Sequence, residues 1–470
     1  MMQGTTVRSA DRSTNANGAL AVLTSLFFLW GFITVLNDVL VPHWKELFQL
    51  SYAQSLLVQF CFFGAYFIGS LVYYFISIAS GDPIERIGYK RGLMVGLGLS
   101  ALGCALFAPA SYLHSYAAHL VALFVLGLGF TVLQIAANPF VAIIGPAESA
   151  SSRLNLAQAF NSLGTTLAPL IGGWLIFDQV DPSAAVRMPY IGLAMLLALI
   201  ALVVRASRLP EPARAERSMD SNAMRHPQLR WGMVAIFCYV GAEVAVGSLI
   251  IGFLGLTGVM GLDEEVAKHY LSLYWGGAMT GRFLGAVALN AAMPFTRKLA
   301  SMLVIGAAMF GLLMLLNATG PVSVVDFWPM ALLILGNIAV ALLARENAGR
   351  AMGMFAAVAV ALLVAVVVAD GQVAAWAIIA IGLFNSILWS NIFTLSIAGL
   401  GSDTAQGSSL LVMMILGGAL TPWAQASIID LIGASSGTER GFHLSFILPL
   451  ACYAYLVWYG LRGSTLRSNA

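Results

Sequence analysis

Apolar runs of about 20 residues, separated by short polar turns, repeat along almost the whole chain. A helix of about 20 residues crosses roughly 30 Å of bilayer hydrocarbon, so each run predicts one membrane-spanning helix. Six runs precede a polar stretch and eight follow it. The predicted spans cover residues 19–41, 54–78, 92–111, 116–144, 155–177, 188–206, 231–256, 269–290, 299–317, 327–344, 351–369, 374–398, 408–432 and 445–462.

The same pattern predicts the domain organisation. A six-helix bundle is expected over 19–206 and a second bundle over 231–462, joined by an Arg-rich linker at 207–230. Residues 1–18 and 463–470 are expected to be polar tails. The first of these tails lacks the order of a secretory signal peptide, a basic region followed by a short apolar core.

Composition supports a membrane protein. The chain is 60% hydrophobic and 9% charged, whereas soluble domains carry about 25% charged residues. We therefore expect an all-α polytopic membrane protein. A net charge of +2 gives no reason to expect a nucleic-acid partner. The four cysteines are scattered singly in apolar stretches, without the spacing of disulfides or metal sites, so no metal or other cofactor is expected.

Basic residues predict the orientation, because Lys and Arg concentrate in cytoplasmic loops. Of the 23 Lys and Arg, only Lys45, Arg187, Lys268 and Arg440 fall in loops on the side opposite the N-terminus, and Arg282 falls inside a span. Both termini are therefore expected to be cytoplasmic, in the inner membrane of the cell.

Three ionisable residues lie inside predicted spans, where each costs about 2.5–3.5 kcal/mol or more. Asp38 closes the first span, where it either exchanges a coupling cation such as a proton or faces the outer headgroups. Glu243 lies near the middle of the seventh span and either titrates or pairs with a cation. Arg282 is its candidate partner, or else holds the end of its own helix by snorkelling.

Amides and aromatic rings complete the candidate site. Amides in hydrocarbon need replacement hydrogen bonds, which a polar solute or a neighbouring helix can supply. A sugar is bound by amides and carboxylates at its hydroxyls and by an aromatic ring at its apolar face. Any single amide could instead join two helices. The candidate substrate-binding residues are Asn37, Gln134, Asn138, Gln158, Asn161, Asn385, Asn391, Trp30, Trp275 and Trp389.

The turn after the second span reads GDPIERIGYKR, residues 81–91. Its glycines and its Glu85–Arg86 pair could latch helix ends in one conformation and release them in another, and we group Arg282 with this pair as candidate gating residues. A simple basic cytoplasmic loop would explain the lysine and arginines equally well.

This turn resembles the cytoplasmic signature of the major facilitator superfamily, with Glu85 in place of Asp. Longer motifs are similar to the fucose–galactose–glucose symporter family and, within it, to the glucose/galactose and related hexose transporters. These motifs are FFLWGFITVLND at 27–38, LQIAANPF at 133–140, SSRLNLAQAFNSLG at 151–164, YVGAE at 239–243, GLFNSI at 382–387 and LGSDTAQGSSLLVMMILGGAL at 400–420.

The resemblance implies two helical bundles that alternate access to a central cavity, and a sugar importer that works as a monomer by proton symport. It implies Asp38 as the protonation site and Gln134 as a substrate contact, with Asn138, Gln158 and Asn161 lining the cavity. A sodium-coupled symporter, an uncoupled facilitator and a non-transporting sugar sensor remain alternatives. An enzyme is not expected, because all six histidines fall in loops or at span ends.

Three departures from the family pattern stand out. Gln134 occupies a position where fucose permeases have Glu, so Glu243 could take over part of that role. Trp389-Ser390-Asn391 replaces the family's Phe-Pro-Thr. The family has twelve helices, so we interpret residues 298–349 as an inserted helix pair on the outside of the second bundle.

Overall fold

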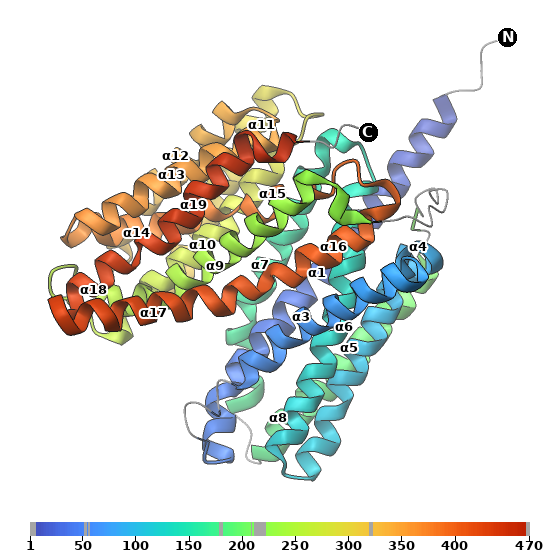
Figure 1. The fold of residues 1–470 in the computed structure, drawn as a ribbon, viewed down its shortest axis with the longest axis horizontal. Helices are drawn as coiled ribbons and strands as arrows, with labels where there is room; N and C mark the ends of the chain where they lie inside the picture. The colour runs from blue at the N-terminus through green and yellow to red at the C-terminus, as the bar shows by residue number, and fades with distance from the viewer. Residues whose placement is uncertain are drawn as a thin grey trace. The chain divides into compact units, whose positions relative to one another are not determined.

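A computed structural model describes residues 6–50, 54, 57–177, 182–207, 209–210, 222–318 and 323–466. Within these ranges, the description excludes the side chains of residues 6–17, 38–43, 45–46, 59, 169–170, 172–177, 182–185 and 324. The described chain folds into helices joined by short turns (Figure 1).

The chain forms two compact units, which are described separately. Unit 1 contains residues 1–153, 160–223 and 399–413, and unit 2 contains residues 154–159, 224–398 and 414–470. Each unit thus includes a short segment from the opposite half of the sequence.

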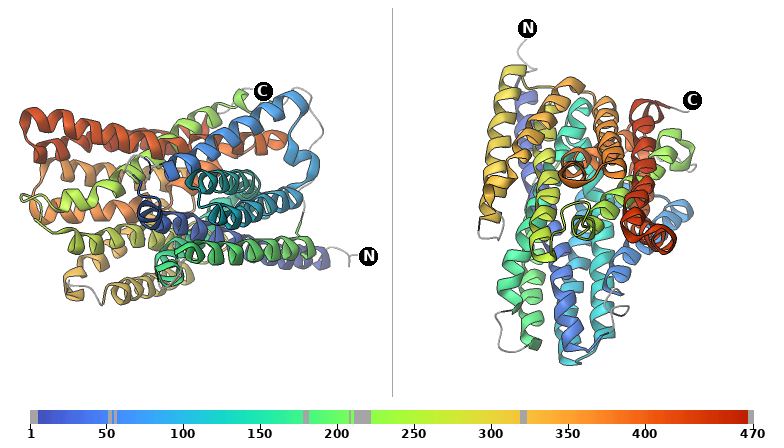
Figure 2. Two further views of the ribbon diagram at one scale, coloured as in Figure 1. Left: turned by 90° about the horizontal axis from the view of Figure 1, so that it is seen from below. Right: turned by 90° about the vertical axis from the view of Figure 1, so that its left-hand side faces the viewer.

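Unit 1 is a bundle in which α5 packs along both α6 and α8, and α3 packs along α6 (Figures 1 and 2). Its helices are α1 (Thr6–Leu47), α3 (Leu57–Ser80), α4 (Pro83–Ile87), α5 (Tyr89–Tyr112), α6 (Tyr116–Ile143), α7 (Ala150–Phe177), α8 (Pro182–Ala206) and α16 (Thr404–Met413). Two glycines let α1 and α7 touch. A Cβ at Gly31 would lie 2.2 Å from the carbonyl oxygen of Asn161, and one at Gly164 2.1 Å from that of Phe28.

Unit 2 repeats this pairing, since α13 packs along α14 and α19, and α10 packs along α14. Its helices are α9 (Pro227–Leu254), α10 (Glu264–Ala288), α11 (Phe295–Asn317), α12 (Pro329–Ala344), α13 (Ala348–Val368), α14 (Gly371–Asn385), α15 (Leu388–Ile397), α17 (Gly417–Ser436), α18 (Thr438–Ser445) and α19 (Ile447–Leu461). Helices α11 and α12 pack on each other and on α10, with α12 also touching α13 and α14. Gly277, Gly281 and Gly285 of α10 all face residues 383–387, close enough that a Cβ at each would contact them.

Twelve segments of the described chain are long and apolar enough to cross a membrane. Helices α7 and α10 coincide with the two remaining predicted spans, 155–177 and 269–290. The expected all-α membrane fold is therefore confirmed.

Several helix boundaries differ from those predicted. Helix α1 begins at Thr6, so it includes most of the expected N-terminal tail. The span predicted at 374–398 is two helices, α14 and α15. The last predicted span, 445–462, coincides with α19, and a separate short helix, α18, precedes it and ends at Ser445. Pro449 has no N–H to bond the Ser445 carbonyl four residues earlier, so it favours the break between α18 and α19.

Candidate functional site

Two amides of α6 are the most unusual polar groups of unit 1. Gln134 is 1% exposed and Asn138 is fully buried. They are four residues apart, so they share one face of the helix. Within the part of the chain that the structure describes, neither the oxygen nor the nitrogen of either amide has a hydrogen-bond partner. Buried amides are normally hydrogen-bonded, so this face is ready to receive a polar partner.

Other predicted amides already have protein partners. Asn37 accepts a hydrogen bond at Oδ1 from the Tyr190 hydroxyl, which leaves its Nδ2 unpaired. Asn161 donates from Nδ2 to the Phe27 carbonyl at 2.9 Å and so joins α7 to α1. Gln158 is 7% exposed and lies in the stretch of α7 that belongs to unit 2.

Glu243 and Arg282 meet in unit 2, as the sequence suggested they could. The Arg282 guanidinium lies 3.3 Å from Glu243 Oε1, and both side chains are buried, with 14% and 11% exposed for Arg282 and Glu243. The Tyr239 hydroxyl donates to the same carboxylate oxygen at 2.8 Å. The pair is therefore held by a short internal network rather than left as two isolated charges.

Two tyrosines in this network were missed by the sequence reasoning. Besides Tyr239, the Tyr274 hydroxyl donates to the Glu243 backbone carbonyl at 2.9 Å and accepts from Asn385 Nδ2 at 2.9 Å. Tyr239 lies one helical turn before Glu243, so its spacing was a usable signal. Tyr274 lies on another helix, α10, and no spacing in the sequence links it to Glu243.

The two predicted amides of α14 and α15 differ. Asn385 Oδ1 is buried without a partner. Asn391 has both ends engaged: Oδ1 accepts from Asn155 Nδ2 at 3.2 Å, and Nδ2 donates to the Ala348 carbonyl at 3.2 Å. In this conformation Asn391 connects α15 to Asn155 and to the start of α13 at Ala348.

The three candidate tryptophans also have different surroundings. Trp30 donates from Nε1 to the Tyr66 hydroxyl at 3.3 Å. Trp389 is 9% exposed and stacks on Phe393. Trp275 is 41% exposed, so much of its ring lies on the surface of unit 2.

The turn between α3 and α5 is organised by Asp82, a residue that the sequence reasoning did not single out. Asp82 Oδ1 accepts from the backbone N–H groups of Ile84 and Glu85 and from the Tyr73 hydroxyl at 2.6 Å, so it caps α4. Burial raises the pKa of the Asp82 carboxyl, and the hydrogen bonds from Tyr73 and the two amides oppose this only in part. Glu85 and Arg86 follow on α4, where Arg86 carries its charge in the last turn.

A chain of hydrogen bonds continues from Asp82 to α16. Ser77 Oγ lies 3.5 Å from Asp82 Oδ2 and accepts from Gln406 Nε2 at 3.1 Å. Gln406 Oε1 in turn accepts from the backbone N–H of Ala223, near the end of the linker. The buried side chains of Ser77, Asp82 and Gln406 thus connect α3, α4, α16 and the end of the linker.

Asp38 lies in α1, but its side chain is outside the described residues. In the parts of the chain that the structure describes, no three His, Cys, Asp or Glu side chains gather as a metal site would require.

Comparisons with known proteins agree with this architecture. Residues 18–362 match the model of the Major Facilitator Superfamily. The chain is 42% identical over 461 residues to a glucose/galactose transporter of Brucella abortus, covering 96% of this chain and 95% of that protein. It is 36% identical to a putative glucose/galactose transporter of Helicobacter pylori, with 96% and 98% covered.

A solved structure is similar along the whole chain as well. The fucose:proton symporter of Escherichia coli superposes with a TM-score of 0.73 at 26% identity, covering 96% of this chain and 100% of that one. Fold, spans and sequence agree, and the chain is a membrane transport protein rather than an enzyme. It belongs to the major facilitator superfamily, within the fucose–galactose–glucose symporter family and its glucose/galactose transporter branch.

Proposed function

We propose that this protein imports a monosaccharide, a hexose such as glucose or galactose, by proton symport with alternating access. The names of its relatives support a sugar as the solute. The name of the L-fucose-proton symporter of Escherichia coli, 29% identical over 480 residues, supports a proton as the coupling ion. The small-molecule sugar and the coupling cation are then the ligands, and no cofactor is required.

The observation that carries the proposal is the pair Gln134 and Asn138. Among the described residues, the four amide atoms of this pair, buried on one helix face, have no hydrogen-bond partner. Each unpaired buried polar group costs about 1–3 kcal/mol, so the chain retains these groups against its own stability. Two amides offer alternating donors and acceptors, the arrangement that vicinal sugar hydroxyls require.

We assign the remaining roles by the same reasoning. Asn37 Nδ2 in unit 1 and Asn385 Oδ1 in unit 2 have no partner among the described residues, and each is proposed as a further sugar contact. Gln158, Asn161, Trp30 and Trp389 are proposed to line the path. Asn391 reaches the sugar only after leaving Asn155, and Trp275 is the least suited because of its exposure.

We place cation coupling at Asp38, with Glu243 as a second carboxylate. Glu243 Oε1 is already engaged by Arg282 and Tyr239, so a coupling cation at this carboxylate would compete with the Arg282 guanidinium. Glu85, Arg86 and Arg282 are proposed to gate the conformational change. Sodium coupling and uncoupled facilitation are the alternatives that the experiment below separates.

We further propose that the protein lies in the inner membrane as a monomer, with both termini in the cytoplasm. We also propose that residues 298–349, which include α11 and α12, are an inserted pair. The packing supports this, because α11 and α12 have no counterpart in the helix pairing that unit 1 shares with unit 2.

The test is uptake of labelled sugars into proteoliposomes under an imposed proton gradient or sodium gradient. The panel comprises glucose, galactose, fructose, mannose, N-acetylglucosamine and fucose, with Asp38→Asn and Glu243→Gln beside the wild type. We expect hexose accumulation with the proton gradient only, and its loss in Asp38→Asn. Accumulation with sodium, or equilibration without either gradient, would replace the coupling assignment, and no uptake of any sugar would overturn the substrate.

A further inference from the structure

Helices α9 and α19 pack along each other in unit 2 (Figure 1). Side-chain contacts between them define their register. The Tyr459 hydroxyl donates to the Gln228 carbonyl at 3.0 Å. The Tyr455 hydroxyl donates to the Trp231 carbonyl at 2.9 Å, and the ring centroids of Trp231 and Trp458 lie 5.3 Å apart. Higher residue numbers on α9 therefore face lower numbers on α19, and the two helices are antiparallel.

This register places two cysteines opposite each other. Cys238 lies seven residues after Trp231, and Cys452 lies seven residues before Tyr459. Seven residues are about two helical turns, so each cysteine is on the same face as its aromatic reference, about 10 Å further along the helix pair. The two thiols are accordingly in hydrogen-bond contact with each other. The fold thus pairs cysteines that lie far apart in the sequence.

The seam between α9 and α19 is open to small molecules. Both thiols are half-buried, whereas Cys104 of unit 1 is fully buried. On the same two helices, Trp231 is 42% exposed and Trp458 is 36% exposed, so this side of the pair lies at the surface of unit 2. Both helices belong to segments apolar enough to cross a membrane. The seam is therefore accessible to a small neutral molecule dissolved in the bilayer.

The spacing of two packed helices suits a covalent bond between facing cysteines. Helix axes in contact lie about 8–10 Å apart, and each Cα lies about 2.3 Å from its own axis. Facing Cα atoms thus come within the range of about 4.4–6.8 Å that a disulfide spans. Cysteine side chains are short, so thiols that already touch need little movement to form the bond.

We propose that Cys238 and Cys452 are a modification site, at which a hydroperoxide oxidises the two thiols to a disulfide that ties α9 to α19. One thiol loses its proton and attacks the O–O bond of hydrogen peroxide, which forms an S–O bond and releases water. The second thiol attacks the sulfur of this sulfenic acid. The S–S bond forms, the S–O bond breaks and a second water leaves. Two thiols and one peroxide thus give one disulfide and two waters.

The disulfide would join the first and last long helices of the second half of the chain. It would be reversible, because a thiol reductant exchanges with the exposed edge of the pair and restores both cysteines. Disulfides of this kind, in proteins that also face a reducing cytoplasm, respond to the redox state rather than serve as permanent links. The site would therefore report oxidation at the membrane.

The experiment exposes the full-length protein in detergent to hydrogen peroxide and then counts free thiols in the unfolded chain, with and without dithiothreitol. The test protein is Cys61→Ala/Cys104→Ala, which keeps only Cys238 and Cys452. The matched control is Cys238→Ala/Cys452→Ala, which keeps the cysteines of α3 and α5, two helices that both pack along α6. Gel filtration and thermal unfolding confirm that each protein is folded. The readout does not depend on which solute is transported.

We expect the test protein to lose both thiols together, with an intact mass lower by two hydrogen atoms, and to regain both with dithiothreitol. Proteins that keep only Cys238 or only Cys452 should retain a sulfenic acid that dimedone traps, and the second cysteine should abolish that trapping. The control protein should form no disulfide within the chain.

Three results would overturn the proposal. The first is retention of both thiols at a peroxide concentration that oxidises the unfolded test protein. The second is disulfide formation to the same extent in the control protein. The third is a disulfide that links two chains instead of Cys238 and Cys452 of one chain.

Discussion

Buried amide side chains of this protein fall into two groups: some are hydrogen-bonded to other helices, and others have no partner among the described residues. The two groups therefore differ in their effect on the free energy of unfolding. Asn161 and Asn337 each donate to a backbone carbonyl, at 2.9 Å and 2.8 Å, and so stabilise helix contacts. Gln134 and Asn138 make no such bond. The first group contributes to folding, whereas the second lowers stability, as expected if these amides serve the sugar binding proposed for them.

Replacing Gln134 should separate these two effects. We expect Gln134→Leu to reduce sugar uptake at least tenfold, because loss of one or two hydrogen bonds to the sugar costs about 1.4 kcal/mol or more. The same change should leave the unfolding temperature equal or higher, since it removes an unpaired buried amide. Asn337→Leu is the matched control, and it should lower the unfolding temperature with little change in uptake. Equal loss of stability in both variants would contradict the binding role.

The Glu243–Arg282 pair should behave as a buried ion pair. Glu243→Gln or Arg282→Met alone leaves one buried charge uncompensated, which typically costs about 3–5 kcal/mol. We expect the double variant Glu243→Gln/Arg282→Met to unfold at a higher temperature than either single variant. The exposed pair Lys268–Glu265 is the control, and its removal should change stability little. Additive losses in the double variant would show that the two side chains act independently.

At the scale of elements, Asp82 joins the end of α3 to the start of α4 while its carboxylate is buried. Burial raises its pKa, so the folded protein binds a proton at Asp82 more tightly than the unfolded chain. The stability contributed by that proton is fully present below the ordinary pKa of aspartate. It is lost as pH rises through the raised folded value.

Asp82→Asn should remove this pH dependence. Asn keeps an oxygen that accepts from Tyr73 and from the α4 backbone, and it carries no charge to bury. We therefore expect the variant to be as stable as the wild type or more so near neutral pH. Asp82→Leu loses the cap and leaves the Tyr73 hydroxyl unpaired, a cost of about 1–2 kcal/mol. Unfolding temperatures across pH provide the measurement, and an unchanged pH profile in Asp82→Asn would assign the dependence to other groups.

Helix α16 is held on α3 by the bond from Gln406 to Ser77, although it comes from the second half of the chain. If alternating access requires α16 to leave α3, fixing the two should stop transport. We expect a short thiol cross-link in Ser77→Cys/Gln406→Cys, made without native cysteines, to abolish uptake, and reduction to restore it. The single-cysteine proteins treated alike are the controls. Full uptake by the cross-linked protein would show that this contact persists throughout the cycle.

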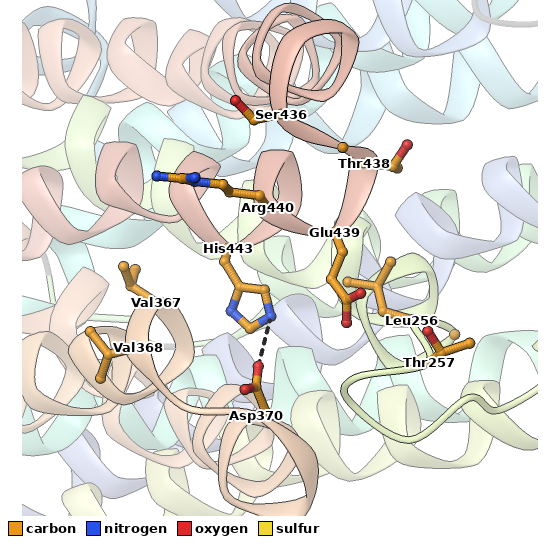
Figure 3. A pocket seen from close by; sticks show the side chains of 12 residues that line it. Leu256, Thr257, Val367, Val368, Asp370, Ser436, Thr438, Glu439, Arg440 and His443 are labelled. Atoms are coloured by element: carbon orange, nitrogen blue, oxygen red, sulfur yellow. Dashed lines mark ion pairs between the residues drawn. The ribbon is translucent and has the colours of Figure 1, made fainter.

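At the scale of the whole molecule, the helix order predicts the side of the membrane on which each connection lies. The turn between α13 and α14 and the turn between α17 and α18 should lie outside, and the two termini inside. Alkaline phosphatase inserted at Asp370 should therefore be active, while a fluorescent protein at the C-terminus should fold. The reverse pattern would invert the proposed orientation and would place the pocket lined by His443 and Asp370 in the cytoplasm (Figure 3).

The apolar runs by themselves determined the helices, because a backbone in hydrocarbon must satisfy its own hydrogen bonds and a helix does so within one segment. Gly277, Gly281 and Gly285 recur every four residues, a spacing that places them on one face of α10, and this face makes the close contact with residues 383–387. The motifs determined the family. Glu243 and Arg282 were recognised singly as costly, and their pairing was one of several options.

Only the tertiary structure decided which polar groups meet. Asn391 and Asn155 are 236 residues apart, Gln406 and Ser77 are 329 apart, and His443 lies 77 residues from the Val366 carbonyl that its ring contacts. An apolar run specifies that a helix forms, but not its rotation about its axis or its neighbours. Gln134 is unpaired whereas Asn391 is bonded at both ends, because packing determines which of these buried amides find partners.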